Sequence, residues 1–275
     1  MSRIVKVFMG GDVCYDKGLQ AVTLGLPRFL KENPCDFVIY NGENASGGNG
    51  LLPCDAEQIF AAGADVITGG NHIFEKRDSY DFLANEPRVL RPHNYPAGFS
   101  AFCASVIETP GRGFGFYQKN GVNFAVLNIQ GRKAMTPLDD PFVCAANAAR
   151  QAEEQDAIMF VDFHAEANDE KEALALFLDG KICALCGTHT HVQTADQRIL
   201  PNGTAYITDL GMTGVADSAI GSNPEIVIQR NMKQVLYKME SAEGDLYLQG
   251  ALICVDTETK KALSIERINY KVENA

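Results

Sequence analysis

The sequence predicts an α/β protein in which two β-sheets pack together and helices lie on their outer faces. In the first half of the chain, short apolar runs alternate with helical stretches at the spacing of βαβ units, which favours a largely parallel sheet. The middle and the end instead contain paired strand-like runs. The chain has 275 residues, 46% of them hydrophobic, and neither a repeat nor a linker. It is therefore expected to fold as a single domain over residues 1–275.

The first half is expected to contain three strands and three helices. The strands are the apolar runs Ile4–Met9, Phe37–Tyr40 and Asp65–Thr68. The helices are expected from about Lys17, with an interruption near Gly25–Pro27, at Asp55–Ala62 and at Lys76–Ala84. Asp55 is the expected N-cap of its helix, because an aspartate side chain accepts hydrogen bonds from first-turn N–H groups.

The second half begins with a hairpin signal. The strand-like runs Gly113–Gln118 and Asn123–Ile129 flank Lys119-Asn120-Gly121, and Asn-Gly is typical of a tight hairpin turn. The remaining expected strands are Ile158–Asp162, Ile182–Cys186, Ala205–Thr208 and a closing hairpin of Leu246–Val255 with Ala262–Tyr270. The helices are expected at Ala145–Gln155 and at Glu170–Leu178, which Gly180 closes.

Charge and composition argue against several classes of function. The formal net charge is -11, and no cluster of Lys and Arg forms the basic stripe that a groove for long nucleic acid needs. No apolar run reaches the roughly 18 residues of a membrane span, and residues 1–11 resemble a first strand rather than a signal peptide. The 8 cysteines have no disulfide-framework spacing, which favours reduced thiols. We expect a cytoplasmic protein that binds neither long nucleic acid nor a membrane.

Potential metal ligands gather in loops just beyond the expected strands. These loops contain four of the 5 histidines and are rich in Asp, Glu, Asn and Gly. They read Gly10-Gly11-Asp12, Asn41-Gly42-Glu43-Asn44, Gly69-Gly70-Asn71-His72, Asp162-Phe163-His164 and Gly187-Thr188-His189-Thr190-His191. Ligands of α/β sheets bind outside the carboxyl ends of strands, so five strand ends would deliver these side chains to one rim. Any one loop is explained as well by a turn or a buried histidine, but their joint occurrence predicts a metal centre.

The His189-Thr190-His191 segment is the strongest single motif. Side chains at i and i+2 of an extended segment point to opposite faces unless the segment bends. A bend at the strand end would let one imidazole reach each of two adjacent metal ions.

These motifs together resemble the calcineurin-like metallophosphoesterases, and within them the YmdB-like family of bacterial phosphodiesterases. The superfamily pattern is matched by Asp12, Glu43, Gly70-Asn71-His72, His164 and Gly187-Thr-His189-Thr-His191. Segments similar to the YmdB-like family are Asn41–Asn44, Asp162–Glu166, Gly187–Asp196, Asp209–Gly214 and the tail Ala262–Arg267. The resemblance covers essentially the whole chain and implies a sandwich of two mixed β-sheets flanked by helices.

The resemblance also implies a ligand set for two metal ions per chain. It assigns one ion to Asp12, Glu43, Asn44 and His191, and the other to Glu43 as a bridge with Asn71, His164 and His189. His72 is then the catalytic proton donor rather than a ligand. Mixed oxygen and nitrogen ligands suit iron, which is favoured first, or manganese or zinc.

A few positions depart from the family pattern or stay open. Cys14 stands where most metallophosphoesterases have a histidine, and a small buried residue is favoured there over a soft ligand. Asn94 is a candidate substrate contact. The stretch Ser46–Gly50 could bring backbone N–H groups to a phosphate or be a plain flexible loop. Cys183 and Cys186 lie in an apolar strand, which favours packing over metal or redox chemistry.

The expected function is hydrolysis of small phosphodiesters, and the resemblance points to 2′,3′-cyclic nucleotides. A metal-bridged hydroxide would attack the phosphorus, and His72 would protonate the leaving oxygen. Two carboxylates, a hydroxide and a diester monoanion balance two divalent ions, whereas a monoester dianion leaves excess negative charge. Alternatives are a 3′,5′-cyclic nucleotide, a short oligonucleotide or a phosphomonoester as substrate, or a metal-stabilised regulatory protein with little turnover. The sequence leaves the oligomeric state open, a homo-oligomer included.

Overall fold

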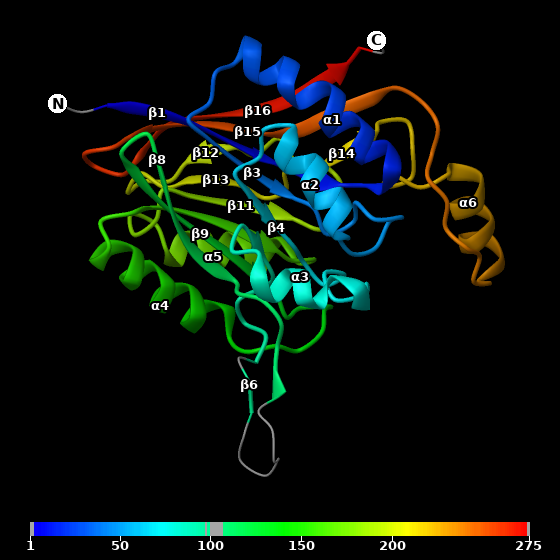
Figure 1. Cartoon of the computed structure of the whole chain (residues 1–275), viewed down its shortest axis with the longest axis horizontal. Coiled ribbons are helices and arrows are strands. Elements are labelled where there is room, and N and C mark those ends of the chain that lie inside the picture. The colour runs from blue at the N-terminus through cyan, green and yellow to red at the C-terminus, as the bar shows by residue number, and fades with distance from the viewer. Residues whose placement is uncertain (1–2, 97, 100–106, 274–275) are drawn as a thin grey trace.

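The structure, a computed structural model, describes residues 3–96, 98–99 and 107–273. Two mixed sheets pack face to face with helices outside them (Figure 1), which confirms the predicted fold class. An eight-stranded sheet has the order β2-β14-β15-β1-β3-β4-β5, with β16 beside β15. A six-stranded sheet has the order β12-β13-β11-β10-β9-β8.

The eight-stranded sheet is parallel on one side and antiparallel on the other. Its strands are β1 (Ile4–Gly10), β2 (Asp12–Val13), β3 (Phe37–Asn41), β4 (Val66–Thr68), β5 (Val89–Leu90), β14 (Met212–Val215), β15 (Leu246–Asp256) and β16 (Ala262–Val272). Strands β1, β3, β4 and β5 run parallel, as the βαβ spacing predicts. Strand β15 pairs antiparallel with both β1 and β16, so the expected closing hairpin is confirmed.

The six-stranded sheet has a parallel centre. Its strands are β8 (Phe114–Lys119), β9 (Val122–Gln130), β10 (Ile158–His164), β11 (Ala184–Thr188), β12 (Arg198–Ile199) and β13 (Ala205–Ile207). The β8–β9 hairpin is confirmed, and its turn residues Asn120 and Gly121 have φ angles of 50° and 76°. A separate two-stranded ribbon joins β6 (Gly98–Phe99) to β7 (Ile107–Glu108).

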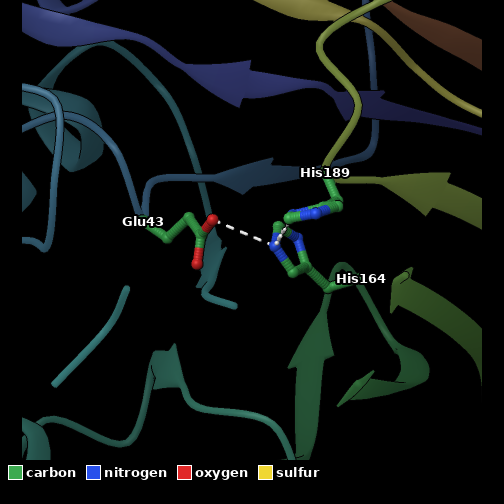
Figure 2. Close-up of side chains that lie close together, drawn as sticks. All are labelled: Glu43, His164 and His189. Carbon is green, nitrogen blue, oxygen red and sulfur yellow. Dashed lines mark hydrogen bonds and ion pairs between the residues drawn. The ribbon is translucent and has the colours of Figure 1, made fainter. Parts of the chain in front are cut away.

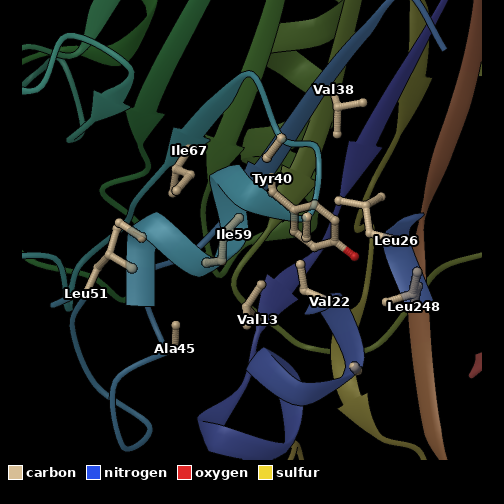
Figure 3. Packing of buried hydrophobic residues seen from close by; sticks show 14 of the residues in the cluster. Val13, Val22, Leu26, Val38, Tyr40, Ala45, Leu51, Ile59, Ile67 and Leu248 are labelled. Carbon is tan, nitrogen blue, oxygen red and sulfur yellow. The ribbon is translucent and has the colours of Figure 1, made fainter. Parts of the chain in front are cut away.

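Helices cover the outer face of each sheet. The eight-stranded sheet is covered by α1 (Tyr15–Glu32) and α2 (Pro53–Ala61), whose apolar side chains pack on β3 and β15 (Figure 3). The six-stranded sheet is covered by α4 (Pro141–Glu154) and α5 (Asn168–Phe177). A short 3₁₀ turn, η1 (Arg77–Ser79), leads into α3 (Tyr80–Asn85), and α6 (Pro224–Lys233) stands at the side of the molecule with no buried residue.

The core between the sheets comes from alternate residues of facing strands. Val5, Val7 and Met9 of β1 point into it, and Phe37 of β3 stacks on Phe124 of β9 with ring centroids 4.4 Å apart. Each of these side chains contributes about 1.5–3 kcal/mol through burial. No helix in the described part of the chain combines the length and apolarity needed to cross a membrane.

Two local predictions about helices are wrong. Helix α1 continues through Pro27, where an interruption was expected. The proline costs about 3 kcal/mol in a helix interior, but burial of Val22, Leu26 and Phe29 on the inner face outweighs that cost. Asp55 is not an N-cap, because α2 begins two residues earlier, after Leu52. Its carboxylate instead accepts a 2.5 Å hydrogen bond from the Ser46 hydroxyl.

Candidate metal centre

The carboxyl ends of parallel strands from both sheets meet at one edge, and a buried carboxylate ties them together. Asp162 accepts hydrogen bonds from Asn41 at 3.0 Å, Thr68 at 2.5 Å and Thr188 at 2.6 Å. These partners lie at the ends of β3, β4 and β11, and Asp162 itself lies near the end of β10. Burial raises the pKa of Asp162, while the three donors oppose that shift. The network fixes where the loops beyond these strands begin.

The loop after β11 bends at both of its histidines, as the predicted ligand pair His189 and His191 requires. His189 and His191 have φ angles of 102° and 63°, in the left-handed region that non-glycine residues adopt rarely. Between them, the Thr190 N–H donates to Asp209 Oδ2 at 3.1 Å, and Lys171 Nζ donates to the same oxygen at 2.8 Å. Lys171 and Asp209 are both fully buried. A buried ion pair therefore holds a strained loop in place.

Hydrogen bonds fix the tautomers of two histidines at the strand ends. The Thr188 hydroxyl donates its proton to Asp162, so it must accept the 2.9 Å hydrogen bond from His164 Nδ1. His189 Nε2 lies 3.2 Å from Glu166 Oε2, so a neutral His189 donates from that nitrogen. In their neutral forms, both imidazoles therefore carry a lone pair on the opposite nitrogen, His164 Nε2 and His189 Nδ1.

These two nitrogens face each other, with the Glu43 carboxylate beside them (Figure 2), and Asn71 adds a second oxygen acceptor. His164 Nε2 lies 3.0 Å from His189 Nδ1, 3.0 Å from Glu43 Oε1 and 2.9 Å from Asn71 Oδ1. Four electron pairs converge with no proton between them when both rings are neutral. Such a site requires a cation, and Glu43, His164 and His189 form a group whose ligand atoms all lie within 4.8 Å of one another.

A proton supplies part of this positive charge in the absence of a metal ion. Burial alone would lower the pKa of His164, but Glu43 outweighs it and raises that pKa. Burial alone would raise the pKa of Glu43, but His164 lowers it to about 2. The pKa of His189 falls to about 3 through burial and the neighbouring His164 charge.

A second group of ligands surrounds Asp12. Its Oδ1 atom is fully buried without a hydrogen-bond partner, 3.8 Å from His164 Nδ1 and 3.9 Å from His191 Nε2. Burial raises the pKa of Asp12 to about 6, against the opposing effect of His191. Asn44 Nδ2 lies 3.1 Å from His191 Nε2 and 3.3 Å from Glu43 Oε1. An orphaned carboxylate oxygen fits a cation here, and Asn44 would have to present its oxygen instead of its nitrogen to be a ligand.

Cys14 contacts the imidazole ring of His191. His191 Nδ1 lies 3.1 Å from the Ile220 carbonyl oxygen and 3.3 Å from Cys14 Sγ. The carbonyl accepts from Nδ1, which leaves Nε2 as the nitrogen that faces Asp12. Cys14 is buried, as expected for a small packed residue.

His72 lies beside the bridging candidate Glu43. The His72 backbone N–H donates to Glu43 Oε2 at 3.0 Å, and its side chain is 32% exposed. His72 Nδ1 contacts Glu75 Oε1 at 2.5 Å. The structure therefore gives His72 a carboxylate partner and access to solvent.

Sequence reasoning did not assign the outer partners Glu75, Glu166, Asp162, Asp209 and Lys171. Asp162, Glu166 and Asp209 all lie inside segments that resemble the YmdB-like family, which is the signal that could have identified them. Glu75 and Lys171 carry no motif signal, because their contacts arise only when the chain folds.

Two other predicted features have structural partners. Asn94 Nδ2 donates to the backbone oxygens of Gln130 and Asp139, at 2.9 and 3.0 Å, and its oxygen accepts from the Gln130 N–H at 3.0 Å. A substrate contact would require breaking these bonds. Cys183 and Cys186 pack in the core between the sheets, and the 7 described cysteines are free. Cys103 lies outside the described residues.

A two-sheet sandwich with histidine, carboxylate and amide donors converging beyond its parallel strands defines an α/β protein with a candidate metal site. The model of the YmdB-like protein family matches residues 8–268, and the chain belongs to this family.

Relatives extend over nearly the whole chain. The chain is 42% identical to the 2′,3′-cyclic-nucleotide 2′-phosphodiesterase of Bacillus subtilis, over 96% of each protein. A crystal structure of a novel phosphatase of Mycoplasma pneumoniae matches with a TM-score of 0.89 and 31% identity, over 100% of this chain and 96% of that one. A hypothetical protein from Thermus thermophilus matches with a TM-score of 0.85 and 36% identity, over 98% and 100%.

Proposed function

We propose that this protein is a dinuclear-metal phosphodiesterase that hydrolyses small phosphodiesters, with 2′,3′-cyclic nucleotides as its main substrates. The observation that carries the proposal is the convergence of His164, His189, Glu43 and Asn71 beside the unpartnered oxygen of Asp12. The activity named for the Bacillus subtilis relative supports the choice of substrate.

The ligands divide into two sets that share Glu43. We assign Asn71, His164 and His189 to one ion, and Asp12, Asn44 and His191 to the other. Iron is favoured, with manganese and zinc as alternatives, because the donors are oxygen and imidazole nitrogen without thiolate. When bound, such ions supply positive charge for the phosphoryl oxygens and lower the pKa of a water molecule.

His72 is the proton donor in this proposal. It is outside both ligand sets, and its contact with Glu75 leaves Nε2 as the nitrogen available to a leaving oxygen. The Glu75 carboxylate orients the imidazole and stabilises its protonated form. A ribose oxygen leaves poorly as an anion, so this proton is worth roughly 10²–10⁴-fold in rate.

Charge favours diesters over monoesters. The ligand sets contain two carboxylates, Asp12 and Glu43, and both are fully buried. An additional dianion would leave uncompensated negative charge in a buried site, which is costly. Reduced thiols in the core fit a cytoplasmic location, which we include in the proposal.

The test is metal analysis combined with a substrate screen. The purified protein should contain about two metal ions per chain and should hydrolyse 2′,3′-cyclic nucleotides faster than 3′,5′-cyclic nucleotides or phosphomonoesters. Faster turnover of monoesters would identify a phosphatase, and metal-free protein with full diesterase activity would overturn the mechanism. Metal-loaded protein without turnover on any of these substrates would instead support a regulatory role.

A further inference from the structure

A groove opens directly beside the metal centre, on the side of His191. It has a volume of about 460 Å³, within the range of small-ligand sites. Its lining comes from the loop after β11, from the segment after β14 and from one face of the β15–β16 hairpin. Because His191 belongs to both the groove and the candidate ligand set, a phosphate bound at the metals would place the rest of its molecule next to this space.

One side of the groove is apolar and exposed. Val192 is 60% exposed and Ile220 is 53% exposed, and Met212 lies near them in the lining. Isolated apolar residues on a surface need no explanation, but these line a concave site next to polar chemistry. They offer an apolar contact of the kind that a nucleobase or ribose can cover.

The other side of the groove is polar and comes from the hairpin. Gln249 faces Asn269 across the strands, and both of its ends are used: Nε2 donates to Asn269 Oδ1 at 3.3 Å and Oε1 accepts from the Met212 N–H at 3.0 Å. Arg267 lies two residues before Asn269 on β16, so both side chains are on the same face of the hairpin. Arg267 and Asn269 both line the groove.

Arg267 is an exposed cation with no ion pair among the residues that the structure describes. On the same strand, Lys271 is already paired with Asp245 at 2.5 Å. A guanidinium matches the geometry of a phosphate and can bind it through two parallel hydrogen bonds. In a chain with a formal net charge of -11, an unpaired arginine beside the metal centre favours an anion in this groove.

We propose that the groove binds the nucleoside of the substrate and that Arg267 binds a second phosphoryl group on that nucleoside. This inference rests on the proposed function. With the 2′ and 3′ oxygens engaged in the cyclic phosphate, the 5′ oxygen is the remaining ribose position that carries phosphate. The substrate class is therefore a nucleoside 2′,3′-cyclic phosphate with a 5′-phosphoryl group, either as a free nucleotide or as the 3′ end of a short oligonucleotide.

Kinetics with matched substrates test the inference. The wild-type protein should show a KM about 10–100-fold lower for adenosine 2′,3′-cyclic phosphate bearing a 5′-phosphate than for the same compound without it, as expected for charged hydrogen bonds. Arg267→Ala should abolish this difference between the two compounds. Arg267→Lys, which keeps the charge but not the planar fork, should retain part of it.

One further substrate and one control variant sharpen the result. A diadenylate that ends in a 2′,3′-cyclic phosphate has a 5′ phosphodiester, so a larger KM advantage for it than for the 5′-monoester would identify RNA 3′ ends as the source. Lys271→Ala removes an exposed positive charge from the same strand, outside the groove lining. It should leave the preference for a 5′-phosphoryl group unchanged.

A binding measurement separates this inference from the proposed function. In calorimetric titrations, adenosine 3′,5′-bisphosphate should bind the metal-loaded protein about 10–100-fold more tightly than adenosine 3′-monophosphate, and Arg267→Ala should remove the advantage. If the advantage is present but no cyclic nucleotide is hydrolysed, the proposed function fails and the Arg267 site stands. If hydrolysis is present but both ligands bind equally to the wild type and the variant, the inference fails and the proposed function stands.

Discussion

The two halves of the proposed metal centre differ in how completely the protein has arranged its donors. Around His164, three donor atoms lie within 2.9–3.0 Å of Nε2. Hydrogen bonds to Thr188 and Glu166 fix the tautomers of the two imidazoles there. Around His191, the carboxylate of Asp12 is 3.9 Å from Nε2, and the Asn44 amide presents its nitrogen.

Under the proposed assignment, this difference predicts unequal affinities for the two metal ions. The His164 half requires no rearrangement, whereas the His191 half requires a rotation of the Asn44 amide and a closer approach of Asp12. Binding loses free energy when donors must first be ordered, so a preorganised site binds more tightly. We expect the ion held by Asn71, His164 and His189 to bind first, and the ion held by Asp12, Asn44 and His191 to bind second.

The largest effect is expected at Glu43, which the two halves share. Glu43 contacts His164 through one oxygen and receives the His72 N–H through the other. Glu43→Gln should lower the affinity for both metal ions by more than the roughly 10–100-fold that is typical of outer-shell changes. Diesterase activity should fall as the ions are lost. Metal content by elemental analysis is the measurement. Retention of two tightly bound ions would show that Glu43 does not bridge the halves.

The second-largest effect is expected from substitution of His72, which should not change metal binding by either half. His72→Ala should retain both metal ions and slow hydrolysis of 2′,3′-cyclic nucleotides by roughly 10²–10⁴-fold, because a ribose oxygen needs a proton to leave. An activated aryl phosphodiester, whose leaving group departs as an anion, should lose much less. Equal losses on both substrates would contradict a role as general acid. Glu75→Gln serves as a milder variant, with a smaller loss in the same pattern.

A third prediction concerns the buried ion pair under the His189–His191 loop. Lys171→Met removes the partner of Asp209 and leaves a buried charge uncompensated, so the free energy of unfolding should fall by about 3–5 kcal/mol. Denaturant unfolding measures this value. The double variant Lys171→Met with Asp209→Asn should recover part of the stability, and a single-variant loss below about 1 kcal/mol would contradict the assigned role.

The smallest effect should separate the two halves. Glu166→Gln removes the carboxylate that faces His189. It should lower the affinity for the first metal ion by roughly 10–100-fold, while the affinity for the second ion changes less. Cys14→Ser is the matched change beside His191 in the other half. This substitution should change the affinity for the second ion only. If either variant lowers the affinity for both ions equally, the two halves do not bind metal independently.

The architecture was largely readable from the sequence. Periodicity and the Asn120-Gly121 turn predicted both hairpins and the parallel order of the early strands. The short strands β12 and β14 escaped prediction because two to four residues give no periodic signal. Helix α6 was missed too, since it buries no residue and therefore has no apolar face turned toward a core. At Pro27, tertiary packing overrode the local preference.

The site was predictable only in part. The loops that carry Asp12, Glu43, Asn71, His164 and His189–His191 were identifiable because they follow strands. The structure brings these side chains to one edge. The orientation of each imidazole was not predictable, since it depends on Thr188, Glu166 and Ile220, which come from different elements. The groove with Arg267 was likewise unpredictable, because its two walls are far apart in the sequence.

The most direct test of the unequal halves is a calorimetric metal titration of the metal-free protein. We predict two binding steps, with the tighter one lost in His164→Ala and the weaker one lost in His191→Ala. The tighter step should strengthen as pH rises, because the ion replaces a proton on His164, whose pKa Glu43 raises. A single step, or loss of the tighter step in His191→Ala alone, would contradict this account.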